Sequence, residues 1–232
     1  MKKIVVFSGA GISAESGLST FRDNGGLWDN YDINEVATPE AWTANPELVL
    51  DFYNMRRKNA FEAKPNKAHI ELGLLEHFFD VHVITQNIDN LHERGGSTKV
   101  LHLHGEVDKV RSLGTGKVYD HGNQPLNFGD LCPDGFQLRP HIVWFGEPVP
   151  NLEIAAEIVS SADVFIVAGT SLNVYPAAGL AHCSPEKAIK FLVDPSDEVK
   201  IPSIKNLTVI KEKASTGIPK IIAELRELMI ND

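Results

Sequence analysis

Short runs of β-branched and other apolar residues are the feature that most constrains how this chain can fold. Most of them are apolar at every position rather than at alternate positions, which is typical of strands in a parallel sheet that is covered by helices on both faces. Helical stretches lie between the runs, so the sequence predicts an α/β fold. The predicted strands are Lys3–Ser8, Val81–Thr85, Val100–His104, Ile142–Phe145, Val164–Ala168, Ile189–Val193 and Leu207–Ile210.

Helices are predicted where the apolar spacing changes. Asn45 is the expected N-cap of the longest one, with Pro46 at its first position. Two segments do not fit the alternation, and both are rich in Gly, Asn and Asp or Pro: Glu15–Thr38 and Arg111–Pro140. Loops of this length are usually functional or belong to a second small module. The predicted helices are Pro46–Glu62, Lys67–Phe78, Leu152–Ser160 and Ile218–Met229.

Composition excludes several classes of protein. With 232 residues, 43% of them apolar, the chain can bury one main core and a smaller appendage. No apolar run approaches the roughly 20 residues of a membrane helix, and no apolar leader is visible, so we expect a cytoplasmic protein. The net charge of -9 argues against a nucleic-acid partner and is compatible with basic peptides. Cys132 and Cys183 are too few and too far apart for a disulfide framework.

The segment Gly9-Ala10-Gly11-Ile12-Ser13-Ala14 follows the first predicted strand and matches the dinucleotide-binding pattern G-x-G-x-x-[GA]. In that pattern the first glycine makes the turn and the second lets the backbone approach a pyrophosphate. An ordinary small-residue turn between a strand and a helix is the alternative. The acidic residue expected about 20 positions later is missing, because Phe21–Trp28 has the composition of a loop.

Polar residues also follow other predicted strands, at the edge where an open α/β sheet binds its ligand. Gly169-Thr170-Ser171 offers amides and hydroxyls, and Thr85–Asp89 offers two amides and a carboxylate. The alternative for Asn87 or Asp89 is an N-cap for a helix through Leu91. His104, beside Gly105, is well placed for a general base, although most histidines are structural.

His102 and His104 are two residues apart, so on a strand they point to the same face. Such an H-x-H pair can bind a metal. With His92, His141 and Asp89 as further ligands, a metal-dependent hydrolase is the main alternative from the residues alone.

Five motifs together resemble the signature set of the sirtuin family, in the same order and at similar separations. They are Gly9–Ser13, Gly17–Arg22, Thr85–Asp89, His104-Gly105 and Gly169–Ser171. Arg139–Glu147 looks like the family's peptide-binding strand, and the resemblance extends over essentially the whole chain.

This resemblance implies a Rossmann-like, doubly wound NAD-binding domain formed by residues 1–24, 80–105 and 141–232. Two insertions, 25–79 and 106–140, would form a small module. The implied activity is NAD-dependent removal of acyl groups from protein lysines, with transfer of the acyl group to ADP-ribose and release of nicotinamide. The alternatives are a mono-ADP-ribosyltransferase and a non-catalytic NAD or ADP-ribose sensor, and His104 argues against both.

The resemblance also assigns roles to residues. His104 would be the base, Asn87 would support the reacting ribose, and Asp89 would hold the nicotinamide carboxamide. Acylated-lysine peptides would pair as an added strand with Val143, Phe145, Gly146 and Glu147. The NAD-binding residues would be Gly9, Ala10, Gly11, Ser13, Thr20, Phe21, Arg22, Trp28, Gln86, Asn87, Ile88, Asp89, Gly169, Thr170, Ser171, Asp194 and Ala214.

The chain departs from the family pattern in three places. Ser19 replaces a usual proline, and Asp194 stands where asparagine is common. The four cysteines that bind zinc in most relatives are missing, with Ser112 near the first position and Cys132 near the second pair, so no zinc is expected. Hydrogen bonds and a set of apolar side chains must then hold the small module: Leu113, Val118, Leu126, Phe128 and Leu131.

Tyr53 and Arg56 lie three apart on the predicted helix Pro46–Glu62, so they share a face and suit a carboxylate. A solvated basic patch of Arg56 and Arg57 is the alternative. Tyr-x-x-Arg resembles the acyl-pocket motif of the bacterial and mitochondrial desuccinylase class of sirtuins (class III), and Ala37 matches the small residue that leaves room in that class. The resemblance therefore implies removal of succinyl and malonyl as well as acetyl groups.

Overall fold

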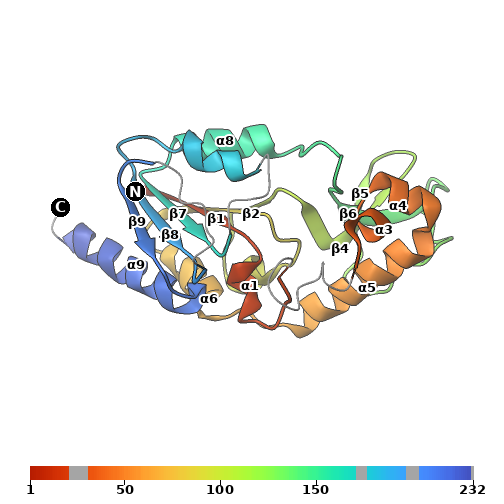
Figure 1. The fold of residues 1–232 in the computed structure, drawn as a ribbon, viewed down its shortest axis with the longest axis horizontal. Coiled ribbons are helices and arrows are strands. Elements are labelled where there is room, and N and C mark those ends of the chain that lie inside the picture. The colour runs from red at the N-terminus through yellow and green to blue at the C-terminus, as the bar shows by residue number, and fades with distance from the viewer. Residues whose placement is uncertain (21–30, 171–176, 197–203, 231–232) are drawn as a thin grey trace.

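The computed structural model describes residues 1–20, 31–170, 177–196 and 204–230. Within these ranges the chain forms a six-stranded sheet and a separate three-stranded sheet. Figure 1 shows the larger sheet with its helices at one end of an elongated molecule and the smaller sheet, with α3, α4 and α5, at the other end. None of the helices in the described ranges is long and apolar enough to cross a membrane.

The larger sheet is parallel throughout and has the order β3-β2-β1-β7-β8-β9. This order confirms the predicted Rossmann-like, doubly wound fold. It reverses between β1 and β7, and the crevice at such a reversal is where open α/β sheets bind ligands. The strands are β1 (Lys3–Ser8), β2 (Asp80–Thr85), β3 (Val100–His102), β7 (Val164–Ala168), β8 (Ile189–Val193) and β9 (Leu207–Ile210).

Alternate residues of one strand pack into two different cores. Ile4 and Val6 of β1 belong to the core under α6 (Lys67–Leu75) and α9 (Ala214–Ile230). Val5 and Phe7 belong to the core on the opposite face, under α8 (Leu152–Ser160) and the 3₁₀ helix η1 (Ala177–Cys183). Burial on both faces is the reason why these strands are apolar at every position.

The predicted helix starts were correct where the cap is local in sequence. The helix α5 (Pro46–Glu62) has the predicted bounds, and the Leu48 N–H donates to Asn45 Oδ1 at 3.1 Å. By contrast, α9 begins at Ala214, four residues before the predicted start at Ile218. Its first turn is held by Glu15, whose carboxylate accepts hydrogen bonds from the Ser215 N–H and hydroxyl at 3.1 and 2.8 Å. This contact joins distant parts of the chain, so no local pattern could predict it.

The smaller sheet lies partly in Arg111–Pro140, where the sequence predicted no strand. It consists of β4 (Gly105–Ser112), β5 (Val118–Asp120) and β6 (Leu138–Ile142), paired antiparallel in the order β5-β4-β6. The predicted strand Ile142–Phe145 was wrong, because β6 ends at Ile142. Beyond it the Val143 N–H donates to the His104 carbonyl and the Phe145 N–H to the Ala37 carbonyl, both at 3.0 Å.

Helices α3 (Ile33–Val36) and α4 (Pro39–Ala44) pack with α5 to form the core of the small module. Two short helices, α1 (Gly11–Ala14) and α7 (Leu91–Arg94), follow β1 and β2. The helix α6 differs from the prediction in two respects. It ends at Leu75 rather than Phe78, and it packs with α9 in a core of the large sheet rather than in the small module. We therefore propose that the first insertion ends near residue 66 instead of residue 79.

Candidate functional site

The turns that follow β1 and β7 are in contact at the point where the strand order reverses. The Gly11 N–H donates to the Gly169 carbonyl at 2.8 Å. A Cβ atom on Gly11 would lie 2.8 Å from Gly169 Cα, and one on Gly9 would lie 2.7 Å from Thr170 Cβ. Gly169 has a φ of +62°, and a Cβ there would lie 2.2 Å from Ile12 N. These glycines are therefore needed for the backbones of the two turns to touch.

The segment Gln86–Asp89 follows β2 and is tied to both glycine turns. Gln86 Nε2 donates to Thr170 Oγ1 at 3.1 Å. Asn87 Nδ2 lies 3.1 Å from both the Gly9 carbonyl and Ser13 Oγ. The structure thus brings together residues from three of the motifs at the carboxyl edge of the parallel sheet.

Asp89 is 6% exposed and uses its two carboxylate oxygens differently. Oδ1 accepts a hydrogen bond from the Leu91 N–H at 3.1 Å, but the N-cap of α7 is Asn90, so the alternative of Asn87 or Asp89 as this N-cap is wrong. Oδ2 accepts one from the Ser13 hydroxyl at 3.2 Å. Burial raises the pKa of Asp89, while the Leu91 N–H, the Ser13 hydroxyl and the charges of His102 and Arg56 oppose this shift.

His104 is half-buried and lies between the end of β3 and the start of β4. Its Nδ1 lies 3.0 Å from the carbonyl oxygen of Gln86, which can only accept, so Nδ1 carries the proton of the neutral ring. Burial lowers the pKa of His104, with the Gln86 hydrogen bond acting in the opposite direction. The ring is therefore neutral near pH 7, with the lone pair on Nε2 able to accept a proton.

His102 does not form a metal site with His104. Its Nδ1 lies 2.8 Å from the Asn87 carbonyl oxygen and its Nε2 lies 2.9 Å from Glu93 Oε1, so both ring nitrogens are engaged. His92 is buried, with Nε2 2.9 Å from Ser8 Oγ. Among the described residues, no group of three His, Cys, Asp or Glu side chains is placed to hold a metal ion. The metal-hydrolase alternative therefore lacks a ligand set in this part of the chain.

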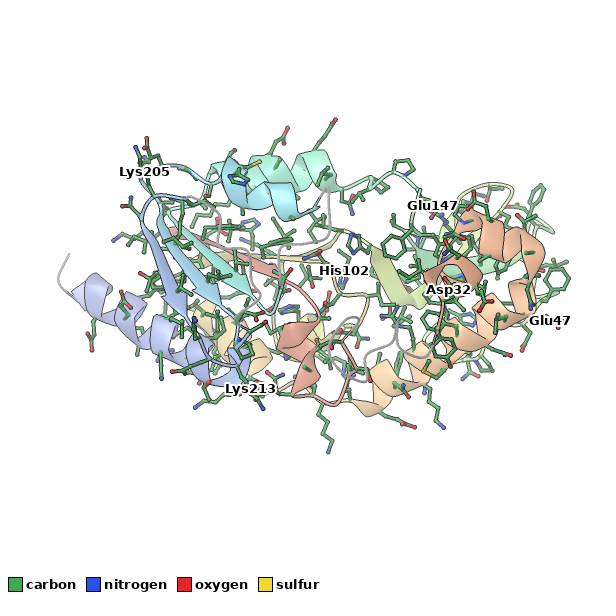
Figure 2. All side chains as sticks on the ribbon, viewed as in Figure 1. Asp32, Glu47, His102, Glu147, Lys205 and Lys213 are labelled. Atoms are coloured by element: carbon green, nitrogen blue, oxygen red, sulfur yellow. The ribbon has the colours of Figure 1, made fainter. Side chains whose placement is uncertain are left out.

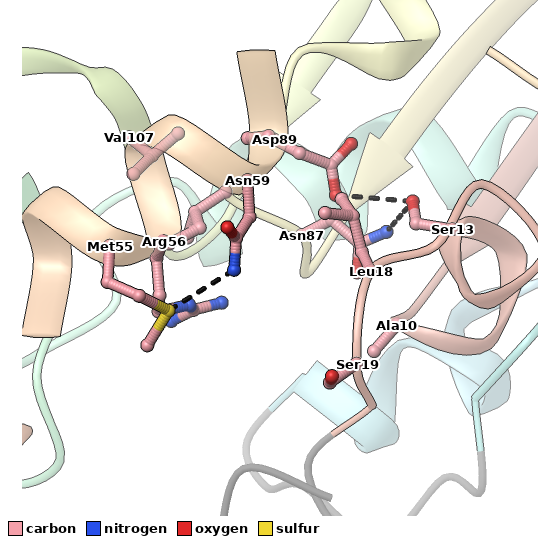
Figure 3. Close-up of a pocket in the computed structure, with 12 residues that line it drawn as sticks. Ala10, Ser13, Leu18, Ser19, Met55, Arg56, Asn59, Asn87, Asp89 and Val107 are labelled. Carbon is pink, nitrogen blue, oxygen red and sulfur yellow. Dashed lines mark hydrogen bonds between the residues drawn. The ribbon is translucent and has the colours of Figure 1, made fainter. Parts of the chain in front are cut away.

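A pocket joins this edge of the sheet to the small module (Figure 3). Ser13, Asn87 and Asp89 line one side, and Arg56 from α5 lines the other. Asn59 and Ala60, which the sequence analysis missed, lie three and four residues after Arg56, and this helical spacing could have revealed them. The lining residues are Ala10, Ser13, Leu18, Ser19, Met55, Arg56, Asn59, Ala60, Asn87, Ile88, Asp89 and Val107.

The side chains of Tyr53 and Arg56 meet near the core of the small module. Tyr53 is buried, and burial raises its pKa to about 12, so its hydroxyl stays protonated. The Arg56 guanidinium carbon lies 5.9 Å from the centre of the Tyr53 ring. Burial lowers the pKa of Arg56, whereas Tyr53 and Asp89 raise it. Arg56 therefore brings a positive charge to one wall of the pocket.

Arg57 is 1% exposed, so the alternative of a solvated patch of two arginines is wrong. Its Nε donates to the Val107 carbonyl at 2.8 Å and its Nη1 to Asn54 Oδ1 at 2.6 Å. Asn54 in turn bonds the backbone of Leu126 through both of its side-chain atoms. Arg57 thus joins α5 to β4 inside the small module.

Backbone hydrogen bonds within the chain hold the segment 143–147. The N–H groups of Val143, Phe145 and Glu147 donate to carbonyls within the chain, and Gly146 has a φ of +89°. The predicted pairing of a peptide with these three N–H groups is therefore not available in this conformation. Ala37 is buried and supplies the carbonyl that the Phe145 N–H contacts, while the Phe145 side chain is exposed.

The Glu147 side chain points into the protein. Its carboxylate accepts hydrogen bonds from Arg139 Nη1 at 2.7 Å, Arg111 Nη2 at 2.9 Å and the Trp144 N–H at 2.8 Å. The Arg139 guanidinium carbon lies 3.3 Å from the centre of the Trp144 ring. These bonds lower the pKa of Glu147 although burial opposes the shift. Glu147 therefore anchors the segment to the small sheet.

The remaining predicted residues do not line this pocket or lie outside the described ranges. Thr20 is half-buried at the end of the first described range. Asp194 follows β8, with Oδ1 2.9 Å from the Ser196 N–H, and Ala214 is buried at the start of α9. Four predicted residues lie outside the described residues: Phe21, Arg22, Trp28 and Ser171.

Ser112 and Cys132, the two residues nearest the zinc-ligand positions expected from the sequence, are close together. Cys132 Sγ donates to Ser112 Oγ at 3.4 Å, and this oxygen also accepts from the Gly114 and Thr115 N–H groups. Cys183, the other cysteine, lies in η1. These residues do not fit the four-ligand site that structural zinc requires.

The expected apolar packing around this place was largely wrong. Leu126 is fully buried, but the other four residues are exposed: Leu113, Val118, Phe128 and Leu131. Gln137 holds the loop instead. Its Nε2 donates to the carbonyls of Leu138 and Asp130 at 2.9 and 3.2 Å, and its Oε1 accepts from the Gly129 N–H at 2.8 Å.

Comparisons with known proteins agree with this geometry. Residues 9–176 match the model of the Sir2 family. An NAD-dependent protein deacylase of Bacteroides thetaiotaomicron is 50% identical over 236 residues, covering 99% of both chains. Among solved structures, a Sir2 homologue in complex with NAD superposes with a TM-score of 0.87 at 36% identity, covering 98% of this chain and 90% of that one. A Sir2 protein bound to a deacetylated p53 peptide and 3′-O-acetyl ADP-ribose superposes with a TM-score of 0.81 at 31% identity, covering 95% of this chain and 92% of that one. The chain belongs to the Sir2 family, the sirtuins.

Proposed function

We propose that this protein is an NAD-dependent protein-lysine deacylase. The observation that carries the proposal is the placement of His104, whose Nδ1 is held by the Gln86 carbonyl while Asn87 and Asp89 line the adjoining pocket. The names of the relatives support the proposal, because they combine NAD dependence with protein deacylation. The reaction moves the acyl group from lysine to ADP-ribose and releases nicotinamide.

The residues at the carboxyl edge of the sheet suit a dinucleotide. The two glycine turns bring backbone amides to the point of strand reversal, and buried polar groups of Ser13, Asn87 and Asp89 lie beside them. When bound, NAD supplies the ribose that accepts the acyl group and the nicotinamide that leaves. The described residues proposed to hold it are Gly9, Ala10, Gly11, Ser13, Thr20, Gln86, Asn87, Ile88, Asp89, Gly169, Thr170, Asp194 and Ala214.

In this proposal Asp89 and Asn87 bind NAD, and His104 transfers the proton. The Asp89 carboxylate accepts hydrogen bonds from the carboxamide, and Asn87 orients the reacting ribose. His104 accepts a proton at Nε2, and its Nδ1–H bond to the Gln86 carbonyl stabilises the imidazolium that forms. Because this bond also fixes the tautomer, the base needs no rearrangement before it acts.

We further propose a preference for acidic acyl groups, as in the class III sirtuins. Arg56 lines the pocket, and the buried Tyr53 ring lies beside it, with its centre 5.9 Å from the guanidinium carbon. A charge-assisted hydrogen bond is worth about 1.5 to 3 kcal/mol, which corresponds to roughly tenfold discrimination or more. Ala37, near Tyr53 in the small-module core, leaves room for the longer acyl chain.

The proposed partners are acylated proteins of the cytoplasm rather than nucleic acids. The net charge of -9 favours basic peptides over phosphate backbones. Both cysteines are free, which is common in reducing compartments. The segment 143–147 remains our proposed peptide edge, with Val143, Phe145, Gly146 and Glu147 shaping it; its carbonyl groups or a change of conformation would provide the pairing.

One assay separates this proposal from its alternatives. The protein is incubated with NAD and lysine peptides carrying acetyl, malonyl or succinyl groups, and the products are read by mass spectrometry. Nicotinamide release that depends on the acyl-peptide, together with O-acyl-ADP-ribose, supports deacylation. ADP-ribose attached to protein would indicate a transferase, and NAD binding without turnover would indicate a sensor.

A further inference from the structure

His102 is held between two hydrogen-bond acceptors. Nδ1 faces the backbone carbonyl of Asn87 at 2.8 Å, and Nε2 faces the Glu93 carboxylate at 2.9 Å. A neutral imidazole has one N–H and can satisfy only one of these acceptors, whereas an imidazolium satisfies both. The geometry therefore favours a charged His102, although its side chain is almost fully buried.

The two histidines at the end of β3 hold successive carbonyls of one segment. His104 bonds the carbonyl of Gln86, and His102 bonds the carbonyl of Asn87. The backbone of Asn87 is also held through its own N–H group, which donates to Thr85 Oγ1 at 3.0 Å. Figure 2 shows His102 in the middle of the molecule, beside β4. His102 thus supports the segment that carries Asn87 and Asp89 from the side opposite the glycine turns.

The charged groups around His102 come from each element packed against it. Glu93 and His92 lie on α7, Glu106 lies on β4, and Asp89 lies on the Gln86–Asp89 segment. Burial lowers the pKa of His102, but the Glu93 hydrogen bond and charge outweigh it and the net shift is upward. The pKa of Glu93 is lowered in turn. The charge on His102 also opposes protonation of Asp89.

We propose that His102 is a positioning residue of the NAD site: its imidazolium, held by Glu93, fixes the Asn87 carbonyl and with it the segment Gln86–Asp89. The inference rests on the proposed function, in which Asn87 and Asp89 of this segment bind NAD. It also gives the two histidines different roles. Near pH 7 His104 is the neutral ring that acts as the base, whereas His102 is charged and holds the Asn87 carbonyl.

The charge of His102 can be read directly. Nitrogen-15 NMR of the imidazole rings distinguishes an imidazolium from either neutral tautomer, and comparison with a His102→Gln sample assigns the signal. The expected result at pH 7 is an imidazolium at His102 and a neutral ring protonated on Nδ1 at His104. A neutral His102 would overturn the proposal without reference to activity.

Glu93→Gln removes the carboxylate that stabilises the His102 imidazolium. The variant keeps a hydrogen bond at this place, since the Gln amide can donate to Nε2 of a neutral His102 ring. The neutral ring of the variant then holds the Asn87 carbonyl without the help of a charge. We expect kcat/KM for NAD and calorimetric NAD affinity to fall about threefold or more at pH 6, where the raised pKa of His102 keeps the parent ring charged, and the loss to be smaller at pH 8. The matched control is Asp80→Asn, which changes the carboxylate 3.1 Å from His82 at the opposite end of β2 and leaves both quantities unchanged.

The outcomes separate this inference from the proposed function. A loss that is equal at both pH values and accompanies a lower Tm would mean that Glu93 and His102 only stabilise the fold. No change at either pH would mean that the charge has no role. A parent protein that binds no NAD would refute the proposed function instead, and the NMR measurement would still decide the charge of His102. If Glu93→Gln does not fold, the NMR titration of the parent decides the question.

Discussion

Arg56 and Arg57 are neighbours on α5, yet Arg56 lines the pocket while Arg57 is buried with its Nε 2.8 Å from the Val107 carbonyl. The 100° step between successive helical residues separates them, so one arginine faces the pocket and the other faces β4. Substitution of Arg56 should therefore change the acyl-group preference, whereas substitution of Arg57 should lower the stability of the fold.

Arg56→Met should suppress removal of succinyl groups by about tenfold or more while sparing removal of acetyl groups. The reason is that only the longer, acidic group reaches the guanidinium. Tyr53→Phe should be a milder version of the same change. Lys58→Met is the matched control, because Lys58 is an exposed cation on the same helix that pairs with Glu62. Initial rates on the two peptides measure the effect, and equal losses on both in the Arg56 variant would refute the preference.

Arg57→Met should destabilise the protein by about 2 to 3 kcal/mol. The substitution leaves the Val107 carbonyl buried without its donor, which costs roughly 1 to 3 kcal/mol, and removes one of the two hydrogen bonds to Asn54 Oδ1, whose other donor is the Leu126 N–H. Urea unfolding at pH 7 measures the change. Lys58→Met again serves as control and should stay within about 0.5 kcal/mol of the parent. A similarly small effect for Arg57→Met would show that its bonds are not needed.

His104→Ala should lower kcat by about 100-fold or more while NAD affinity changes little. The lowered pKa of His104 also sets the pH dependence. Because the neutral form is the base, activity should persist below pH 6.5, the ordinary value for histidine, and fall as the pH drops through the lowered pKa. A pH profile of kcat tests this. His77→Ala, at an exposed histidine far from the pocket, is the control. If NAD affinity fell as far as kcat, the residue would be a binding group rather than a base.

The purified protein should contain no stoichiometric zinc, and a chelator should not change its Tm. The loop around Cys132 is held by Gln137 instead, so Gln137→Ala should cost about 1 to 3 kcal/mol because several backbone groups lose their partner. Metal analysis and thermal unfolding measure the two parts. One zinc per chain, lost together with folding on chelation, would contradict the prediction. Gln124→Ala, an exposed glutamine of the same segment, is the control.

His69 of α6 should make stability depend on pH. The residue is fully buried, and burial lowers its pKa from 6.5 to about 4. Between these values the unfolded chain binds a proton that the folded protein does not, so stability is lost as the pH falls from 6.5 towards 4. The loss from this residue between pH 7 and pH 5 should be about 2 kcal/mol.

His69→Asn removes the titrating ring but can still accept the hydrogen bond that the Asn66 N–H gives to His69 Nδ1. Urea unfolding at pH 7 and pH 5 should therefore show a smaller pH effect in this variant than in the parent. His77→Asn should keep the full effect. An unchanged slope in His69→Asn would assign the acid sensitivity to another group, such as the buried His92.

The site was predictable in part because its motifs are local. Gly9 and Gln86 directly follow β1 and β2, and this position places them at the carboxyl edge of a parallel sheet, whatever the rest of the chain does. The small sheet was not predictable in the same way. The strand β4 is only partly apolar and β5 spans just Val118–Asp120, so their pairing depends on partners far away rather than on periodicity.

The sequence by itself determined the parallel sheet and its turns, because continuous apolar runs can be buried only between two layers of helices and because the glycines permit a close backbone approach. It also determined α5, whose cap is adjacent in the chain. The tertiary structure alone decided that Arg57 is buried against Val107, that Glu147 turns inward to Arg139, and that His102 pairs with Glu93. These outcomes depend on burial and on hydrogen-bond partners from other elements, which no spacing within one segment encodes.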